Sequence, residues 1–354
     1  MLKLILAGVL GIPCLLVAVI TAPILAILSI PSLLLLLFRK DQNDVSTTTT
    51  TTKTHVIIIG GSMGIGLAIA KECARKKDIS KITILARNKT KLDEAKKDIN
   101  KEASMEVEAI SVSVTDYSAL EKISRQITNK EERTIIFNCA GIPYTTEYDR
   151  IPIEVYNKLV QTNLIGSMYV ARAFLPHMVN GCVVFCSSAA GQVGMYGYTA
   201  YSPTKFALRG FAEALHAELI RSKPGVSIQV AFPVDTDTPG YAEEKRMMPE
   251  ITKVLNETAG LATPEDTAKV MVCNAFAKNP NFQVHFTSLG WMLSNLTAGM
   301  SPVSKLSDAV AQVALSGLFR LISLFILNDW WITIRKFRGK EKNKTEKYDD
   351  SKID

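Results

Sequence analysis

The hydrophobic positions of this chain follow two patterns. From about His55 to Thr287, short runs of β-branched and other apolar residues alternate with stretches in which apolar residues recur at helical spacing. Such alternation is typical of strands that lead into helices, and it predicts one α/β domain. The second pattern is a long apolar stretch near each end of the chain, which predicts an appendage at each end.

The N-terminal apolar stretch, Leu4–Phe38, contains no charged side chain. It is longer than the roughly 20 residues that a helix needs to cross a bilayer, and longer than the apolar region of a signal peptide, about 7–15 residues. Its prolines leave open a kinked span or a re-entrant segment. We therefore expect a membrane anchor over residues 1–40 and a threonine-rich polar linker over 41–54, followed by the α/β domain over 55–290.

The C-terminal extension, residues 291–354, is apolar from Ala309 to Asn328 except for Arg320. Trp330 and Trp331 follow, and tryptophan is typical of a membrane interface. Basic residues come next, at Arg335, Lys336, Arg338, Lys340, Lys342, Lys344 and Lys347. We expect an amphipathic or re-entrant segment against anionic lipid, because a full span would place Arg320 near the middle of the bilayer. A solvated charged tail is the alternative.

Composition removes several classes of function. The hydrophobic content of 47% is ample for a core, and the net charge of +7 comes mostly from the C-terminal tail. No basic face with interleaved aromatic residues is visible elsewhere, so nucleic-acid binding is not supported. The six cysteines show no disulfide spacing, and the four histidines are dispersed. We therefore expect neither a disulfide framework nor a metal.

A glycine-rich loop follows the first apolar run. The segment from Val56 to Ile59 is β-branched, the loop reads Gly-x-x-x-Gly-x-Gly from Gly60 to Gly66, and an alanine-containing helical pattern comes next. Glycines at such a place let the backbone approach a pyrophosphate, and the N-terminus of a helix favours its negative charge. The loop therefore predicts a nucleotide site, although a tight turn would need the same glycines.

The segment Tyr201-Ser-Pro-Thr-Lys205 places a phenol and an ammonium four residues apart. On a helix this spacing puts both side chains on one face. A tyrosine normally titrates near 10, and a neighbouring cation lowers that pKa by favouring the phenolate. We therefore expect Tyr201 to exchange a proton with a carbonyl or an alcohol, helped by Lys205.

Together these motifs resemble the short-chain dehydrogenase/reductase family over about residues 54–290. The segment Asn138-Cys139-Ala140-Gly141 is similar to the family's Asn-Asn-Ala-Gly, and Asn163 matches its catalytic asparagine. Ser187 and Ser188 end another apolar run, thirteen or fourteen residues before Tyr201. The resemblance implies a Rossmann-like fold with a doubly wound parallel sheet of about seven strands, and an oxidoreductase that uses a nicotinamide cofactor.

The resemblance also implies a role for each catalytic residue. Tyr201 is the general acid in reduction, and Lys205 lowers its pKa and binds the nicotinamide ribose. Ser188 holds the substrate carbonyl, because the family's usual spacing to the tyrosine is thirteen, while Ser187 stays open as the alternative. Asn163 supports a water that links Lys205 to solvent.

The cofactor preference rests on Arg87, which ends the second apolar run where NAD enzymes usually carry an acid. A guanidinium suits the 2′-phosphate of NADP, and Lys91 is placed to assist. Ser113 stands where the family has an aspartate that contacts adenine, and Pro233-Val234 replaces the family's Pro-Gly. The expected cofactor contacts are Gly60, Ser62, Met63, Gly64, Ile65, Gly66, Arg87, Asn88, Lys91, Ser113, Asn138, Ala140, Gly141, Tyr201, Lys205, Pro233, Thr236 and Thr238.

The run from Asp235 to Gly240, Asp-Thr-Asp-Thr-Pro-Gly, resembles a subfamily that acts on lipids. It implies NADPH-dependent reduction of a long-chain 3-keto sphingoid base at the endoplasmic reticulum membrane, with the catalytic domain facing the cytosol. Asp235 or Asp237 would pair with the substrate ammonium, or both would only cap a turn or a helix. Two other functions stay open, a steroid or retinoid dehydrogenase and an inactive membrane scaffold. A homo-oligomer also stays open.

Overall fold

A computed structural model describes Thr21, residues 53–257 and residues 260–350, with side chains described as far as Phe337. Contacts within the chain divide it between Trp291 and Met292 into two units, which are described separately below. The expected anchor over residues 1–40 and most of the expected linker lie outside the described residues.

The first unit is built on seven parallel strands, which confirms the predicted α/β fold with a seven-stranded Rossmann-like sheet. The strand order is β3-β2-β1-β4-β5-β6-β7, so the order reverses between β1 and β4. Every residue of β1 is buried, which explains its continuous β-branched sequence. The strands are β1 (Thr54–Ile59), β2 (Ile79–Ala86), β3 (Glu106–Ser111), β4 (Arg133–Asn138), β5 (Gly181–Cys186), β6 (Val226–Ala231) and β7 (Gln283–Val284).

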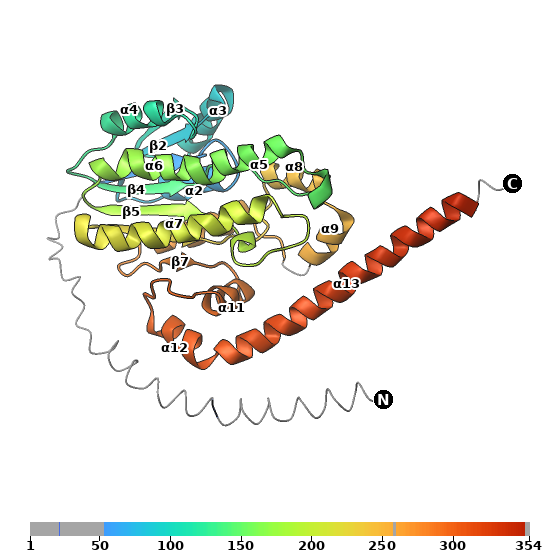
Figure 1. Ribbon diagram of the computed structural model, residues 1–354. Coiled ribbons are helices and arrows are strands. Elements are labelled where there is room, and N and C mark those ends of the chain that lie inside the picture. The colour runs from blue at the N-terminus through green and yellow to red at the C-terminus, as the bar shows by residue number, and fades with distance from the viewer. Residues whose placement is uncertain (1–20, 22–52, 258–259, 351–354) are drawn as a thin grey trace. The chain divides into compact units, whose positions relative to one another are not determined.

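Helices cover both faces of this sheet (Figure 1). Apolar residues of α2, α3 and α10 pack on one face, and those of α4, α6 and α7 pack on the other. The two buried layers hold the strand ends in fixed positions, and the loops at those ends form the site described below. The helices of this unit are α2 (Gly64–Ala74), α3 (Lys89–Asn100), α4 (Tyr117–Ile127), α5 (Ile153–Leu159), α6 (Gly166–Phe174), α7 (Tyr201–Ser222), α8 (Pro239–Met247), α9 (Glu250–Asn256) and α10 (Pro264–Ala275).

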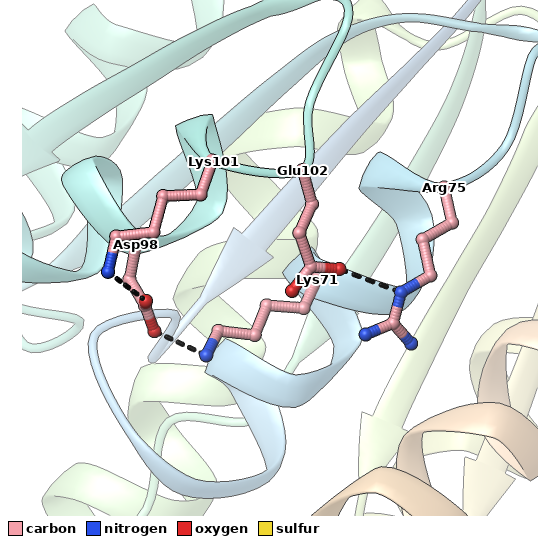
Figure 2. Close-up of polar contacts among 5 residues, drawn as sticks. All are labelled: Lys71, Arg75, Asp98, Lys101 and Glu102. Carbon is pink, nitrogen blue, oxygen red and sulfur yellow. Dashed lines mark hydrogen bonds and ion pairs between the residues drawn. The ribbon is translucent and has the colours of Figure 1, made fainter.

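Charged side chains join α2 to α3 and the turn after it (Figure 2). Asp98 pairs with Lys71 and, at 3.2 Å, with Lys101, while Arg75 pairs with Glu102 at 2.7 Å. These groups are partly or fully exposed, and exposed pairs contribute about 0–1 kcal/mol each. The network therefore adds little to the stability that the apolar layers provide.

The second unit contains the end of α11 (Ser288–Leu296), α12 (Leu306–Ala314) and α13 (Ser316–Asp350). Within the described part of the chain, Ser316–Phe337 is the one helical segment that is long and apolar enough to cross a membrane. This segment lies in the region where the sequence predicts membrane contact.

Candidate active site

A cavity of about 530 Å³ opens at the carboxyl ends of the strands, where the strand order reverses. The loops after β1 and β4 approach closely there, because a Cβ added at Gly60 would lie 2.8 Å from the backbone nitrogen of Ala140. Gly60 also has a φ of +84°, which other residues rarely adopt. Such a crevice is where sheets of this kind bind nucleotides.

The start of α2 leaves its backbone donors open. Its N-cap, Met63, makes no side-chain hydrogen bond to the helix, and Gly64 and Gly66 keep side chains away from the first turn. A Cβ at Gly66 would overlap the carbonyl oxygen of Gly60. Free amides at a helix N-terminus are suited to a phosphate. All six residues predicted from this loop line the cavity: Gly60, Ser62, Met63, Gly64, Ile65 and Gly66.

The end of β2 supplies a basic rim. Arg87 and Lys91 are exposed and line the cavity. Asn88 also lines it, but its Oδ1 accepts a hydrogen bond from the backbone nitrogen of Lys91 at 2.9 Å and so caps α3. Ser113 is the exception among the residues predicted here, because its hydroxyl bonds to Thr115 at 2.8 Å and it does not line the cavity. The neighbouring Val112 and Val114 line it in its place.

Tyr201 and Lys205 lie on one face of α7, as their spacing predicts. The Lys205 ammonium is 5.5 Å from the centre of the Tyr201 ring, and it donates to the backbone carbonyl of Cys186 at 2.9 Å. Lys205 is buried, and burial lowers its pKa. The cation is therefore held at the cavity wall by the end of β5.

The pKa of Tyr201 is raised in the structure, whereas the sequence predicts that it is lowered. Burial raises this pKa well above its usual range, and Glu244 and Cys186 raise it further, while a hydrogen bond with Ser188 lowers it. The phenol therefore holds its proton at neutral pH.

The two adjacent serines are separated by their partners. Ser187 is buried, and its hydroxyl donates to the backbone carbonyl of Lys205 at 2.8 Å. The Ser188 hydroxyl accepts from the backbone nitrogen of Ala190 at 3.1 Å and is hydrogen-bonded to the phenol of Tyr201. Ser188 is thus the serine whose side chain meets the phenol.

Asn163 lies in a π-helical turn, Val160–Ile165, between α5 and α6. Its Oδ1 accepts from the backbone nitrogen of Ile142 at 2.8 Å, and its Nδ2 donates to the Ile142 carbonyl and to Thr204. A Cβ added at Gly141 would lie 3.3 Å from Asn163 Oδ1 and 3.4 Å from Lys205 Nζ, so both side chains meet the same loop. Turns of this type often occur at functional sites, but no sequence pattern signals this one.

The remaining predicted contacts divide into two groups. Ala140, Gly141, Pro233, Thr236 and Thr238 line the cavity, and the Thr238 hydroxyl caps α8 by accepting from the backbone nitrogen of Tyr241. Asn138 is buried at the end of β4 and does not line the cavity. Its Oδ1 has no hydrogen-bond partner among the described residues.

Sequence reasoning missed most of the wall beyond Tyr201. Tyr198, Glu244 and Asn256 are all buried and line the cavity. Burial raises the pKa of Glu244 to about 7, although hydrogen bonding to Tyr198 lowers it. The only sequence signal in this region is the pair of aspartates after β6. Of these, Asp235 lines the cavity, whereas Asp237 is exposed outside it.

Comparisons with known proteins agree with this geometry. The family profile described as short chain dehydrogenase matches residues 54–249. A 3-dehydrosphinganine reductase from Danio rerio is 42% identical over 80% of this chain and 86% of that protein. A 3-ketodihydrosphingosine reductase from Bos taurus is 40% identical over 88% and 95%.

Solved structures share the fold at lower identity. Actinorhodin polyketide ketoreductase with NADPH has a TM-score of 0.56 and 23% identity, over 65% of this chain and 92% of that one. Levodione reductase has a TM-score of 0.56 and 23% identity, over 63% and 90%.

Proposed function

This chain belongs to the short-chain dehydrogenase family, and we propose that it reduces the C-3 ketone of 3-ketodihydrosphingosine to dihydrosphingosine with NADPH, a step of sphingolipid synthesis. The relatives that bear this activity in their names align with most of the chain and are themselves almost fully covered. The substrate assignment rests on them. The reaction type rests on the site.

One observation carries the reaction type. Tyr201, Ser188 and Lys205 line the same cavity as the glycine loop. Asn163 lies beside the loop at Gly141, which Lys205 also meets. A proton donor therefore lies in one enclosed space with a phosphate-binding helix start. This combination suits hydride transfer to a carbonyl that is protonated at the same time.

Bound NADPH supplies the hydride to the carbonyl carbon. Tyr201 donates its phenolic proton to the carbonyl oxygen, and the raised pKa of Tyr201 keeps that proton in place until the oxygen becomes basic. Ser188 hydrogen-bonds the carbonyl oxygen and orients it toward the phenol. Lys205 stabilises the phenolate that forms and returns a proton to it, and Asn163 holds the path by which Lys205 regains a proton from solvent.

Arg87 and Lys91 give the cofactor preference. They lie exposed on the cavity rim at the end of β2, where an enzyme for NAD would place a carboxylate. A guanidinium favours a phosphate through charge-assisted hydrogen bonds. The arrangement therefore supports NADPH over NADH.

We further propose that the protein is held at the endoplasmic reticulum membrane with its catalytic domain in the cytosol. The apolar helical segment Ser316–Phe337 and a lipid substrate support membrane contact. The cysteines of the described residues are all free, which suits a reducing compartment. Asn88 is exposed and begins an Asn-Lys-Thr sequence that glycosylation in the lumen would recognise, so a glycan at Asn88 would place the domain in the lumen and contradict this orientation.

The test of the function is NADPH oxidation by the membrane-bound full-length protein. We expect turnover with 3-ketodihydrosphingosine and little with steroid or retinoid ketones. Turnover of a steroid or retinoid, with none of the long-chain amino ketone, would replace the proposed substrate. No oxidation of NADPH with any ketone would contradict the reaction type.

A further inference from the structure

The wall of the cavity beyond Tyr201 carries polar side chains that the proton transfer does not use. We propose that Asp235, Glu244 and Asn256 form a binding site for the C-2 ammonium of the substrate, so that the enzyme selects a ketone with a cation on the neighbouring carbon. The inference rests on the proposed function, because only that substrate class brings an ammonium beside the ketone.

The three side chains come from separate elements and meet at one place. Asp235 follows β6, Glu244 lies on α8, and Asn256 ends α9. All three line the cavity together with Tyr198 and Tyr201. The Tyr198 hydroxyl bonds to Glu244 and accepts from Asn256 Nδ2 at 3.1 Å, and the Tyr198 ring centre is 5.9 Å from that of Tyr201. The carboxylates therefore lie next to the proton donor, as the position of C-2 beside C-3 requires.

Asn256 holds the carboxylate of Asp235 at this place. It is only 8% exposed, and its Nδ2 donates to Asp235 Oδ2 at 2.9 Å. A carboxylate only accepts, so this bond fixes which end of the amide faces Asp235. The opposite atom, Asn256 Oδ1, is buried with no hydrogen-bond partner among the described residues. That oxygen has almost no exposed surface, so Asn256 acts on the ammonium through Asp235, whose carboxylate it holds in place.

Charge at this place is also unbalanced. None of the ion pairs among the described residues includes Asp235 or Glu244. Burial raises the pKa of both carboxyls, and Asp235 raises that of Glu244 further. Lys205 is the nearby cation and lowers the pKa of Glu244, but that pKa stays raised at about 7. The carboxylates of Asp235 and Glu244 repel each other when both are ionised. A ligand cation favours the ionised form of both acids and offsets this repulsion.

The alternative is that the aspartates after β6 serve only as caps. Thr238, not an aspartate, caps α8, and its hydroxyl accepts from the backbone nitrogen of Tyr241 at 3.1 Å. Asp237 is exposed and does not line the cavity. Asp235 instead bonds to side chains, those of Tyr241 and Asn256, within the cavity wall. Its position is therefore that of a ligand group held in place by neighbours.

The experiment compares two substrates in matched variants of the full-length enzyme. The first substrate is 3-ketodihydrosphingosine, and the second is the same long-chain hydroxy ketone with hydrogen in place of the C-2 amine. The variants are Glu244→Gln and Asp235→Asn, with Glu243→Gln as control, because Glu243 is the exposed neighbour of Glu244 on the same helix. NADPH binding, followed by fluorescence, verifies that each variant is folded.

We expect Glu244→Gln and Asp235→Asn each to lower kcat/KM for the amino ketone about ten- to a hundredfold, mainly through KM, because each loses a charge-assisted bond. The deaminated ketone should show little change in any variant, and Glu243→Gln should match the unmodified enzyme with both. Equal losses on the two substrates, or no loss on the amino ketone, would overturn the ammonium site. If the unmodified enzyme oxidises NADPH with neither ketone, the proposed function fails instead.

Discussion

The two halves of the cavity are built in different ways. The cofactor half is lined by loops that directly follow strands, Gly60–Gly66 after β1 and Ala140-Gly141 after β4, and it presents backbone amides. The substrate half is lined by side chains from the loop after β6, the loop before α7, and helices α8 and α9, which bond to one another. The first half is determined by main-chain geometry, whereas the second depends on contacts between distant residues.

This difference separates general chemistry from selectivity. A pyrophosphate and a nicotinamide are the same in every enzyme that uses them, so a fixed backbone cradle suffices. A substrate that carries a cation next to its ketone needs charged groups placed one by one. We therefore expect changes in the cofactor half or at Tyr201 to affect every substrate equally, and changes in the substrate half to affect them unequally.

The largest expected effect is at Tyr201, which adjoins both halves. Tyr201→Phe keeps the ring, the helix and the contact with Lys205 but removes the proton donor. We expect turnover to fall by about 10²–10⁴-fold, the usual range for lost acid catalysis, with NADPH affinity nearly unchanged. The loss should be the same for the amino ketone and its deaminated analogue. Steady-state rates and NADPH titration measure both, and near-normal turnover would remove Tyr201 from the mechanism.

Sequence reasoning reached the cofactor half because that half leaves local signals. Gly60 needs positive φ and close approach to Ala140, and such needs restrict residue types along the chain. The strands of the sheet can be predicted from the sequence equally well, because buried parallel strands are continuous apolar runs. Membership of the family and the cofactor class follow from these same segments.

The substrate half was hidden for a physical reason. Asn256 is hydrogen-bonded to Tyr198, which lies 58 residues away in the sequence. No local sequence pattern identifies either residue as part of a site. Glu244 reads as an ordinary acid on a polar helix, because only tertiary packing buries it. The same packing reverses the expected pKa shift of Tyr201, since burial is the largest influence on that pKa.

The next effect is on stability and tests whether the substrate half is strained without its ligand. The pKa of Glu244 is raised from 4.5 to about 7, so the folded protein binds more protons than the unfolded chain between these pH values. Stability should therefore fall as pH rises through that window, by roughly 3 kcal/mol in total from 1.36 kcal/mol per pKa unit. Near Glu244 the charged or titratable groups are Tyr198, Tyr201, Lys205, Asp235 and Tyr241.

Glu244→Gln removes the buried charge and should raise the free energy of unfolding at pH 8 by an amount of that order, with little effect at pH 4.5. Thermal unfolding of the ligand-free protein in detergent, at both pH values, measures this. The exposed Glu243→Gln is the control and should change neither. A destabilised Glu244→Gln at pH 8 would show that the carboxylate contributes structural bonds rather than strain.

A smaller effect is expected in the cofactor half. Arg87→Ala removes one charge-assisted contact with the 2′-phosphate, so NADPH should bind about ten- to a hundredfold more weakly. NADH lacks that phosphate, and its affinity should not change. Titration of both cofactors into the variant measures the difference. Equal use of NADPH and NADH by the unmodified protein would contradict the assignment of Arg87.

The smallest expected effect is a coupling free energy close to zero between the two halves. Arg87 follows β2 and Glu244 follows β6, and three strands lie between these two in the sheet. At about 4.8 Å per strand, the two strand ends are roughly 19 Å apart. Changes at such separations are additive within about 0.3–0.5 kcal/mol when they share no partner.

The double variant Arg87→Ala, Glu244→Gln should therefore lose kcat/KM with NADPH and the amino ketone by the product of the single losses. A coupling clearly above that limit would mean that the cofactor loop and α8 move together, and the separation of the cavity into a backbone-built half and a side-chain-built half would be wrong.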